Sequence, residues 1–274
     1  MVAVVSDYEL VHRYDTVNLY RHGAAAKLEL NRPERMNALN AQLGRDLLDA
    51  VNSVGQDPEV RAVLITGAGR AFSSGADLKD GLEQTRDGHP DLYGVLTERY
   101  HPLITGIRQM PKPVVAAVNG AAAGVGLSVA LACDLVIAAE SGYFLLAFVN
   151  IGLVPDGGSS LLVPSRVGFA RATEMAMLGD RIAAGQALEW GLINQVWPDG
   201  ELATRADELI ARLADGPTSS YAGTKRQLNN WLYQQMDQQL ELEAQIQREM
   251  SSSDDFVEGA IAFAERRKAR FSGS

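Results

Sequence analysis

The 274 residues are 46% hydrophobic and 22% charged, a composition typical of a chain that folds around a sizeable core. Lysine and arginine total 25 against 34 aspartates and glutamates, and the net charge of −9 argues against a nucleic-acid partner. No apolar stretch reaches the roughly 18 uncharged residues that a membrane span needs. The first ten residues, MVAVVSDYEL, lack the basic start of a signal peptide. We therefore expect a cytoplasmic protein without a membrane or nucleic-acid partner.

Five apolar runs predict strands, because aliphatic and β-branched residues cluster in them. They cover residues 17–20, 25–30, 60–66, 113–118 and 134–139. Residues 36–54 are predicted to form a helix, because apolar side chains recur there at steps of three and four. These side chains are Met36, Leu39, Leu43, Leu47 and Val51. The alternation indicates an α/β fold, and strands that are apolar almost throughout indicate a sheet covered on both faces.

Residues 79–100 carry many charges among glycines and a proline, without a continuous apolar face, which predicts a mobile, solvated connection. After Gly168 the pattern is mostly helical, with apolar faces at residues 202–213 and 256–263. A further apolar stripe in residues 225–250 predicts a helix packed either on the chain's own core or against another subunit. The stripe consists of Leu228, Leu232, Met236, Leu240 and Ile246.

The single cysteine, Cys133, lies in an apolar run, which predicts a buried and inert thiol. The four histidines lack ligand-like spacing with one another or with Cys133, so no metal site is expected.

Two glycine-containing turns, residues 66–78 and 119–127, each follow a predicted strand and precede a predicted helix. Neither has the third glycine of a dinucleotide-binding turn or the Lys-Ser/Thr ending of a P-loop, which disfavours a nucleotide-phosphate site. Backbone N–H groups at helix starts would hold an oxyanion if the two turns faced each other. The simpler alternative is that the glycines only permit tight connections.

Four motifs in order resemble the crotonase (enoyl-CoA hydratase/isomerase) superfamily. They are NRPERMNAL at residues 31–39, AFSSGADLK at 71–79, PKP at 111–113 with Asn119-Gly120, and ALACD at 130–134. The resemblance implies an N-terminal extension over residues 1–16, a spiral core of ββα turns over 17–200, and a helical trimerisation region over 201–274. It also implies a homotrimer or dimer of trimers that takes a coenzyme A thioester as substrate, with no permanently bound cofactor.

The resemblance places the two backbone N–H donors for the thioester oxygen on Ala76 and Val125. Each donor would stabilise negative charge on that oxygen by roughly 3–4 kcal/mol. It further implies that the residues in contact with the CoA thioester are Arg35, Ala38, Ser74, Gly75, Asp77, Leu78, Lys79, Gly124, Ser128, Phe148 and Lys268. Lys79 and the basic run 266–268 would meet the CoA phosphates, although a solvated helix end explains that run equally well.

Hydratases of the superfamily use two glutamates, and the matching positions here are Ser128 and Phe148, which cannot act as acid or base near neutral pH. A carboxylate follows in GLVPDGG at residues 152–158. This segment resembles the subgroup that includes ring-opening epoxyphenylacetyl-CoA isomerases, in which the aspartate faces the substrate. The resemblance implies that Asp156 shuttles a proton between the α and γ carbons of an enoyl thioester. Pro-Asp-Gly is also a turn signal by itself.

His101 offers a second possibility. In the 4-chlorobenzoyl-CoA dehalogenase branch, a histidine at this position activates water, and an aspartate at the position of Asp156 attacks the aromatic carbon. The chain departs from that branch at Phe148, because a phenyl ring cannot donate the hydrogen bond that a tryptophan gives there. The alternative is an ordinary, partly buried histidine.

We therefore expect an acyl-CoA-processing enzyme of this family, and first an isomerase that shifts a double bond with Asp156 as proton shuttle. Three alternatives stay open. They are an enoyl-CoA hydratase (a lyase) with non-standard acid and base groups, a dehalogenase-like hydrolase that uses Asp156 and His101, and a non-catalytic acyl-CoA binding protein.

Overall fold

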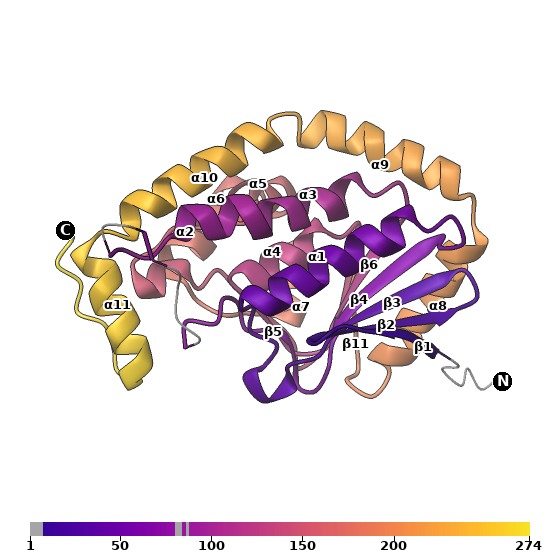
Figure 1. Ribbon diagram of the computed structural model, residues 1–274, viewed down its shortest axis with the longest axis horizontal. Coiled ribbons are helices and arrows are strands. Elements are labelled where there is room, and N and C mark those ends of the chain that lie inside the picture. The colour runs from indigo at the N-terminus through magenta and orange to yellow at the C-terminus, as the bar shows by residue number, and fades with distance from the viewer. Residues whose placement is uncertain (1–7, 80–83, 86–87) are drawn as a thin grey trace.

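The computed structural model describes residues 8–79, 84–85 and 88–274. Its strands form a seven-stranded sheet in the order β1-β2-β3-β4-β6-β8-β11 and a four-stranded sheet in the order β10-β9-β7-β5. Helices pack around both sheets (Figure 1). The strands are β1 (Glu9–Arg13), β2 (Val17–His22), β3 (Ala25–Leu30), β4 (Ala62–Gly67), β5 (Ala71–Ser73), β6 (Val114–Val118), β7 (Ala121–Ala123), β8 (Leu135–Ala139), β9 (Tyr143–Leu145), β10 (Ile182–Ala183) and β11 (Gln195–Trp197).

Each turn of the chain through the core adds one strand to each sheet. β4 of the large sheet leads to β5 of the small one, β6 leads to β7, and β8 leads to β9. The strands that these turns bring side by side pair in parallel. Parallel neighbours need crossover connections, and the helices after β5, β7 and β9 provide them. This repeat confirms the predicted α/β spiral of ββα turns.

The helices follow the strands in the order that a spiral requires. They are η1 (Pro33–Arg35), α1 (Ala41–Gln56), α2 (Leu92–Val95), the π-helical turn η2 (Leu96–Tyr100), α3 (His101–Gln109), α4 (Val125–Ala132), η3 (Phe148–Ile151), α5 (Ser159–Leu162), α6 (Pro164–Leu178), α7 (Ala184–Glu189), α8 (Leu202–Asp215), α9 (Thr218–Leu232), α10 (Met236–Met250) and α11 (Asp254–Glu265). Among the described residues, no helix has the length and apolar character that a membrane span requires.

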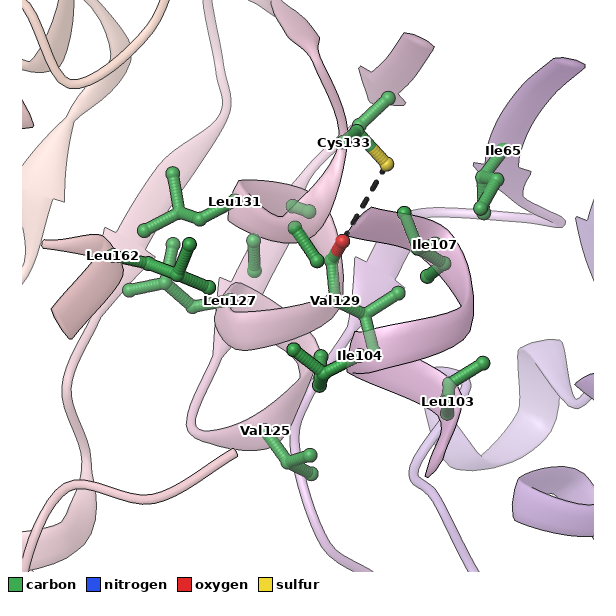
Figure 2. Packing of buried hydrophobic residues seen from close by; sticks show 14 of the residues in the cluster. Ile65, Leu103, Ile104, Ile107, Val125, Leu127, Val129, Leu131, Cys133 and Leu162 are labelled. Atoms are coloured by element: carbon green, nitrogen blue, oxygen red, sulfur yellow. Dashed lines mark hydrogen bonds between the residues drawn. The ribbon is translucent and has the colours of Figure 1, made fainter. Parts of the chain in front are cut away.

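Both faces of the large sheet are covered, which explains why its central strands are apolar throughout. One face, with Leu28 and Ile65, belongs to the main core beneath α1, α3 and α4. The other face, with Leu64 and Val115, packs beneath α8. Figure 2 shows part of the main core, where the fully buried Cys133 donates from Sγ to the carbonyl oxygen of Val129 at 3.5 Å. Burial raises the pKa of this thiol to about 12, so it stays protonated at neutral pH.

The helix predicted over residues 36–54 begins later, with α1 at Ala41. Met36 and Asn37 have a φ of 52°, outside the helical region. The Asn37 side chain accepts from the N–H of Arg32 at 2.9 Å and donates to the carbonyl oxygen of Ala71 at 2.8 Å. These bonds hold the segment beside the first glycine turn, and α1 starts only after Asn40, whose side chain accepts from the N–H of Leu43.

The prediction of a solvated connection over residues 79–100 is wrong for its second half. The chain is helical from Leu92 to Tyr100, and Leu92, Val95, Leu96 and Tyr100 are buried. Their spacing gives one apolar face, which the charged residues around it conceal in the sequence. Residues 80–83 and 86–87 of the predicted connection lie outside the described residues.

Two further predictions need correction. The first glycine turn contains β5 and leads into no helix before Leu92 in the described part of the chain, whereas the second contains β7 and leads directly into α4. The stripe over residues 225–250 belongs to two helices, α9 and α10, that meet at 233–235 (Figure 1). Its α10 part, with Leu240, is buried on the chain's own core, but its α9 part, with Leu228, is exposed.

The ends of the chain pack on the spiral. Residues 9–13, expected in an N-terminal extension, pair with β2 as the edge strand of the large sheet. From the other end, α8 covers that sheet and α10 packs against α2 and α5. The division at residues 16 and 200 stays a prediction. Described residues on both sides of position 200 contribute to each of the two hydrophobic clusters.

Candidate active site

A cavity of about 250 Å³ lies where the two glycine turns approach α2, η2 and the segment that follows β9. Its wall is mostly aliphatic and aromatic, with Leu92 and Leu96 from α2 and η2, Phe148 from η3 and Phe263 from α11. An apolar wall with a few polar groups is the usual form of a small-molecule site.

The two glycine turns touch each other at one end of this cavity. Gly75 has a φ of +93° and Gly124 a φ of +50°, and a Cβ atom added to Gly124 would lie 3.7 Å from the Cα atom of Gly75. Ala76 and Val125 follow these glycines, and both line the cavity. Their N–H groups donate to no acceptor recorded among the described residues. The structure thus brings two backbone donors to one apolar cavity, one of them at the N-terminus of α4.

Asp156 lines the same cavity and is buried. Its Oδ2 atom accepts from Nε2 of Gln247 at 2.7 Å, and its Oδ1 atom has no hydrogen-bond partner among the described residues. Burial raises the pKa of this carboxyl from its ordinary 3.8 to about 8, against the lowering effect of the Gln247 hydrogen bond, and nearby Glu243 raises it further. A carboxyl that titrates near neutral pH suits proton transfer.

The turn after Asp156 is held from behind by α10. The two oxygens of Glu243 accept from the N–H groups of Gly158 at 2.7 Å and Ser160 at 3.1 Å. Glu243 is buried, and burial raises the pKa of its carboxyl to about 7. Sequence reasoning missed Glu243 and Gln247. The only signal was their spacing of four residues in a helical stretch, which does not reveal what they contact.

The predicted contact residues divide into two groups. Some line the cavity, namely Ser74, Gly75, Leu78, Gly124 and Phe148. Ser128 does not belong to the wall, because it is fully buried behind Asp156 and donates from Oγ to the Asp156 carbonyl oxygen at 2.9 Å. Tyr100, which the sequence did not suggest, does line the cavity, and its hydroxyl donates to the carbonyl oxygen of Leu39 at 3.3 Å.

His101 is buried at the start of α3 and is not among the residues that line the cavity. Its Nε2 atom has no hydrogen-bond partner among the described residues. Burial lowers the pKa of the imidazole to about 4, against the raising effect of Glu241, so the ring is neutral at pH 7. The structure does not bring His101 and Asp156 together on one wall, and a joint role of the two stays a prediction.

The remaining predicted contacts lie away from the cavity wall. Asp77 is buried and forms an ion pair with Arg32 at 2.9 Å, so it braces the first glycine turn. Ala38 is buried, and its carbonyl oxygen accepts from the same guanidinium at 2.5 Å. Arg35 and Lys79 are exposed at the outside of this region.

Lys268 is exposed on the C-terminal tail, beside a surface hollow that acidic side chains of α11 also line. Its neighbour Arg267 pairs with Glu258 at 2.5 Å and with Glu265 at 2.6 Å. The run 266–268 is therefore partly neutralised by its own helix. Among the described residues, no group of three or more His, Cys, Asp or Glu side chains is placed to hold a metal ion.

The chain folds as a spiral of ββα turns. It brings two backbone donors and one buried carboxyl to a single apolar cavity, which is the arrangement of an enzyme-like site. The family model described as enoyl-CoA hydratase/isomerase matches residues 21–274. The chain is 43% identical over 247 residues to 1,2-epoxyphenylacetyl-CoA isomerase of Escherichia coli strain K12. The aligned region covers 90% of this chain and 94% of that protein. It is also 43% identical over 260 residues to a probable enoyl-CoA hydratase of Rhodobacter capsulatus, and this alignment covers 95% of this chain and 99% of that protein.

Among solved structures, the crystal structure of an enoyl-CoA hydratase from Mycobacterium avium subsp. paratuberculosis K-10 superposes with a TM-score of 0.86 at 40% identity, covering 95% of this chain and 100% of that one. The chain therefore belongs to the enoyl-CoA hydratase/isomerase family and is an enzyme of that family. The resemblance to the crotonase superfamily is confirmed.

Proposed function

We propose that the protein isomerises an acyl-CoA thioester by shifting a double bond, with Asp156 as the proton shuttle. The observation that carries the proposal is that Asp156 is the one carboxyl among the described residues of the cavity wall, and that its Oδ1 atom has no partner there. The relative named 1,2-epoxyphenylacetyl-CoA isomerase, at 43% identity, supports isomerisation of a CoA thioester in general.

In the proposed reaction, ionised Asp156 removes a proton from the α carbon of a 3-enoyl thioester. The electron pair moves onto the carbonyl oxygen, and the N–H groups of Ala76 and Val125 hold the resulting dienolate. The carboxyl of Asp156 then returns the proton to the γ carbon, which gives the 2-enoyl thioester and regenerates the carboxylate. The substrate supplies the CoA group, so the reaction needs no permanently bound cofactor.

Hydration is the less favoured reaction because it needs a group that activates water and a group that supplies a proton. The wall offers one carboxyl, since Phe148 occupies one of the expected glutamate positions and Ser128 lies behind the wall. The hydrolase alternative is weakened by the position of His101 outside the wall. A binding protein without catalysis would not need a carboxyl whose pKa burial has raised to about 8.

The Asp156→Asn variant tests the proposal in an assay of 3-enoyl-CoA to 2-enoyl-CoA conversion. We expect kcat to fall by about 10²–10⁴-fold, since an amide cannot carry the proton, with little change in binding of a 2-enoyl-CoA product. Asp215→Asn, the same change at an exposed position at the end of α8, should leave kcat unaltered. Undiminished turnover in Asp156→Asn would remove the proposed role, and rapid hydration of crotonyl-CoA would favour the hydratase instead.

We propose a homotrimer or a dimer of trimers, supported by the exposed apolar side chains of α9. The cytoplasm is the proposed compartment, supported by a single cysteine that is buried and free.

A further inference from the structure

Three polar side chains of α10 form a row that faces residues 154–160, the segment that leads from η3 into α5. Gln239, Glu243 and Gln247 recur every four residues, so they lie on one face of the helix. Gln239 donates from Nε2 to Oγ of Ser160 at 2.8 Å. Glu243 accepts from the N–H groups of residues 158 and 160, and Gln247 binds residues 154 and 156. We call these three residues the polar row.

The polar row binds both sides of a turn in the segment 154–160. Gly157 and Gly158 have positive φ angles, and α5 begins at Ser159, so the chain changes direction just after Asp156. From Gln239 to Gln247, the contacts of the row run from Ser160 back to Val154, in the opposite chain direction. The row accordingly fixes the whole segment on both sides of Asp156.

Gln247 uses its complete amide in this contact. Its Oε1 atom accepts from the N–H of Val154 at 3.3 Å, and its two N–H bonds go to the carbonyl oxygen of Val154 at 2.9 Å and to Oδ2 of Asp156 at 2.7 Å. Gln247 is itself fully buried and is not among the residues of the cavity wall. The bonds to Val154 prevent the amide from turning over, so an N–H and not an oxygen faces Asp156.

We infer that Gln247 is a positioning residue of this active site: it ties Oδ2 of Asp156 to α10 and leaves Oδ1 as the oxygen that carries the proton. The inference rests on the proposed function, in which Asp156 is the proton shuttle. It extends the site to a residue 91 positions further along the chain and gives α10 a part in the reaction.

The charges around Asp156 make the inference measurable. The titratable groups recorded beside it are Glu243 from α10 and Tyr100 from η2. Burial and Glu243 raise the pKa of Asp156, and the hydrogen bond from Gln247 lowers it. Removal of the Gln247 N–H therefore raises the pKa of Asp156, because the ionised form loses its donor.

The test is the pH dependence of kcat for 3-enoyl-CoA isomerisation in Gln247→Met, which keeps the length of the side chain and removes the donor. In a plot of kcat against pH, kcat should rise as Asp156 ionises, and we call this part of the curve the rising limb. We expect its midpoint to move to a pH about one unit higher, which makes the ionised fraction of Asp156 about tenfold smaller below the midpoint. KM should change less than about twofold, because Gln247 does not touch the substrate. Gln247→Leu removes the same donor with a different apolar shape. It should move the limb in the same direction by a similar amount, and it carries the test if the Met variant does not fold.

Two control variants separate positioning from support of α10. Gln239→Met removes the bond from the polar row to Ser160 and should leave the midpoint of the limb where it is in the wild type. Gln245→Met makes the same change on the exposed side of α10 and should alter neither kcat nor the limb. Lower activity or stability in both Gln247 variants with an unmoved limb would overturn the inference and leave Gln247 a packing residue. Full turnover in Asp156→Asn would instead remove the proposed function on which the inference rests.

Discussion

In the proposed reaction, the burial that suits Asp156 to proton transfer also opposes folding. The carboxyl is taken out of water and receives one hydrogen bond, from Gln247. Burial penalises the ionised form, which raises the pKa to about 8 and makes the group able to take up and release a proton near neutral pH. The same penalty lowers the stability of the folded chain at pH values where the carboxyl would be ionised in water.

This linkage predicts how stability depends on pH. Between the unfolded pKa near 3.8 and the folded pKa near 8, the folded chain holds the Asp156 proton and the unfolded chain has released it. The stability due to this group is fully present below pH 4 and is lost as pH rises toward 8. In Asp156→Asn, which cannot ionise, the free energy of unfolding should exceed the wild-type value by an amount that grows by about 1.4 kcal/mol per pH unit across this window.

Urea unfolding of both proteins at several pH values measures this difference, with Asp215→Asn as a variant for which it should stay flat. A difference between Asp156→Asn and the wild type that does not change with pH would contradict a raised pKa in the folded state.

At the scale of elements, the proposed site depends on two glycine turns that approach each other closely. Gly75 and Gly124 have positive φ angles, and a Cβ atom on Gly75 would lie 3.0 Å from the carbonyl oxygen of Ala123. The turns follow β5 and β7, which are parallel neighbours in the small sheet. Sheet pairing therefore sets the distance between the N–H groups of Ala76 and Val125.

Gly75→Ala should disturb that distance. The variant has to relieve the contact with Ala123 and a φ of +93°, so we expect a loss of about 1–3 kcal/mol in stability. We also expect a decrease of about 10²-fold in kcat, because the Ala76 donor moves. Gly23→Ala is the control, since Gly23 also has a positive φ, +54°, but has no atom within 4 Å of an added Cβ and lies outside the site. Stability loss in Gly75→Ala with unchanged kcat would argue against the donor role.

At the scale of the whole molecule, α9 presents an apolar stripe that nothing in the described chain covers. Trp231 is 83% exposed, Leu228 52% and Leu232 41%, and the three lie on one side of the helix. Figure 1 shows α9 continuing the line of α10 along the outer edge of the molecule. An exposed stripe of this kind is typical of an interface between subunits.

Trp231→Glu tests this interpretation, because it places a charge in the middle of the stripe. We expect a smaller assembly in analytical ultracentrifugation, with a monomer in place of the proposed trimer, since an unpaired charge is costly to bury in an interface. Asn230→Glu adds the same charge on the other side of α9 and should leave the assembly intact. A wild-type chain that sediments as a monomer would rule out the trimer itself.

The sequence by itself determined five strands of the large sheet, β2, β3, β4, β6 and β8, together with the α/β class and the family, because apolar runs, helical spacing and the motifs at residues 31–39 and 71–79 are local signals. The short strands of the small sheet were not predicted, because runs of two or three residues give no such signal. The sequence also pointed to Ala76, Val125 and Asp156, which the structure brings to one cavity. The helix limit at Ala41 was missed because long-range bonds of Asn37 hold the preceding residues.

Only the tertiary structure decided what surrounds Asp156. Tyr100 and the face of Leu92 and Leu96 reach the cavity from a segment that its charges made look solvated, and His101, one residue further on, does not reach it. Gln247 and Glu243 come from the C-terminal helix α10. Their spacing of four residues predicts that they share one face of a helix. Which residues that face contacts depends on how α10 packs on the spiral. Burial, and with it the pKa of Asp156, follows from that packing because desolvation is a property of all the atoms around a group.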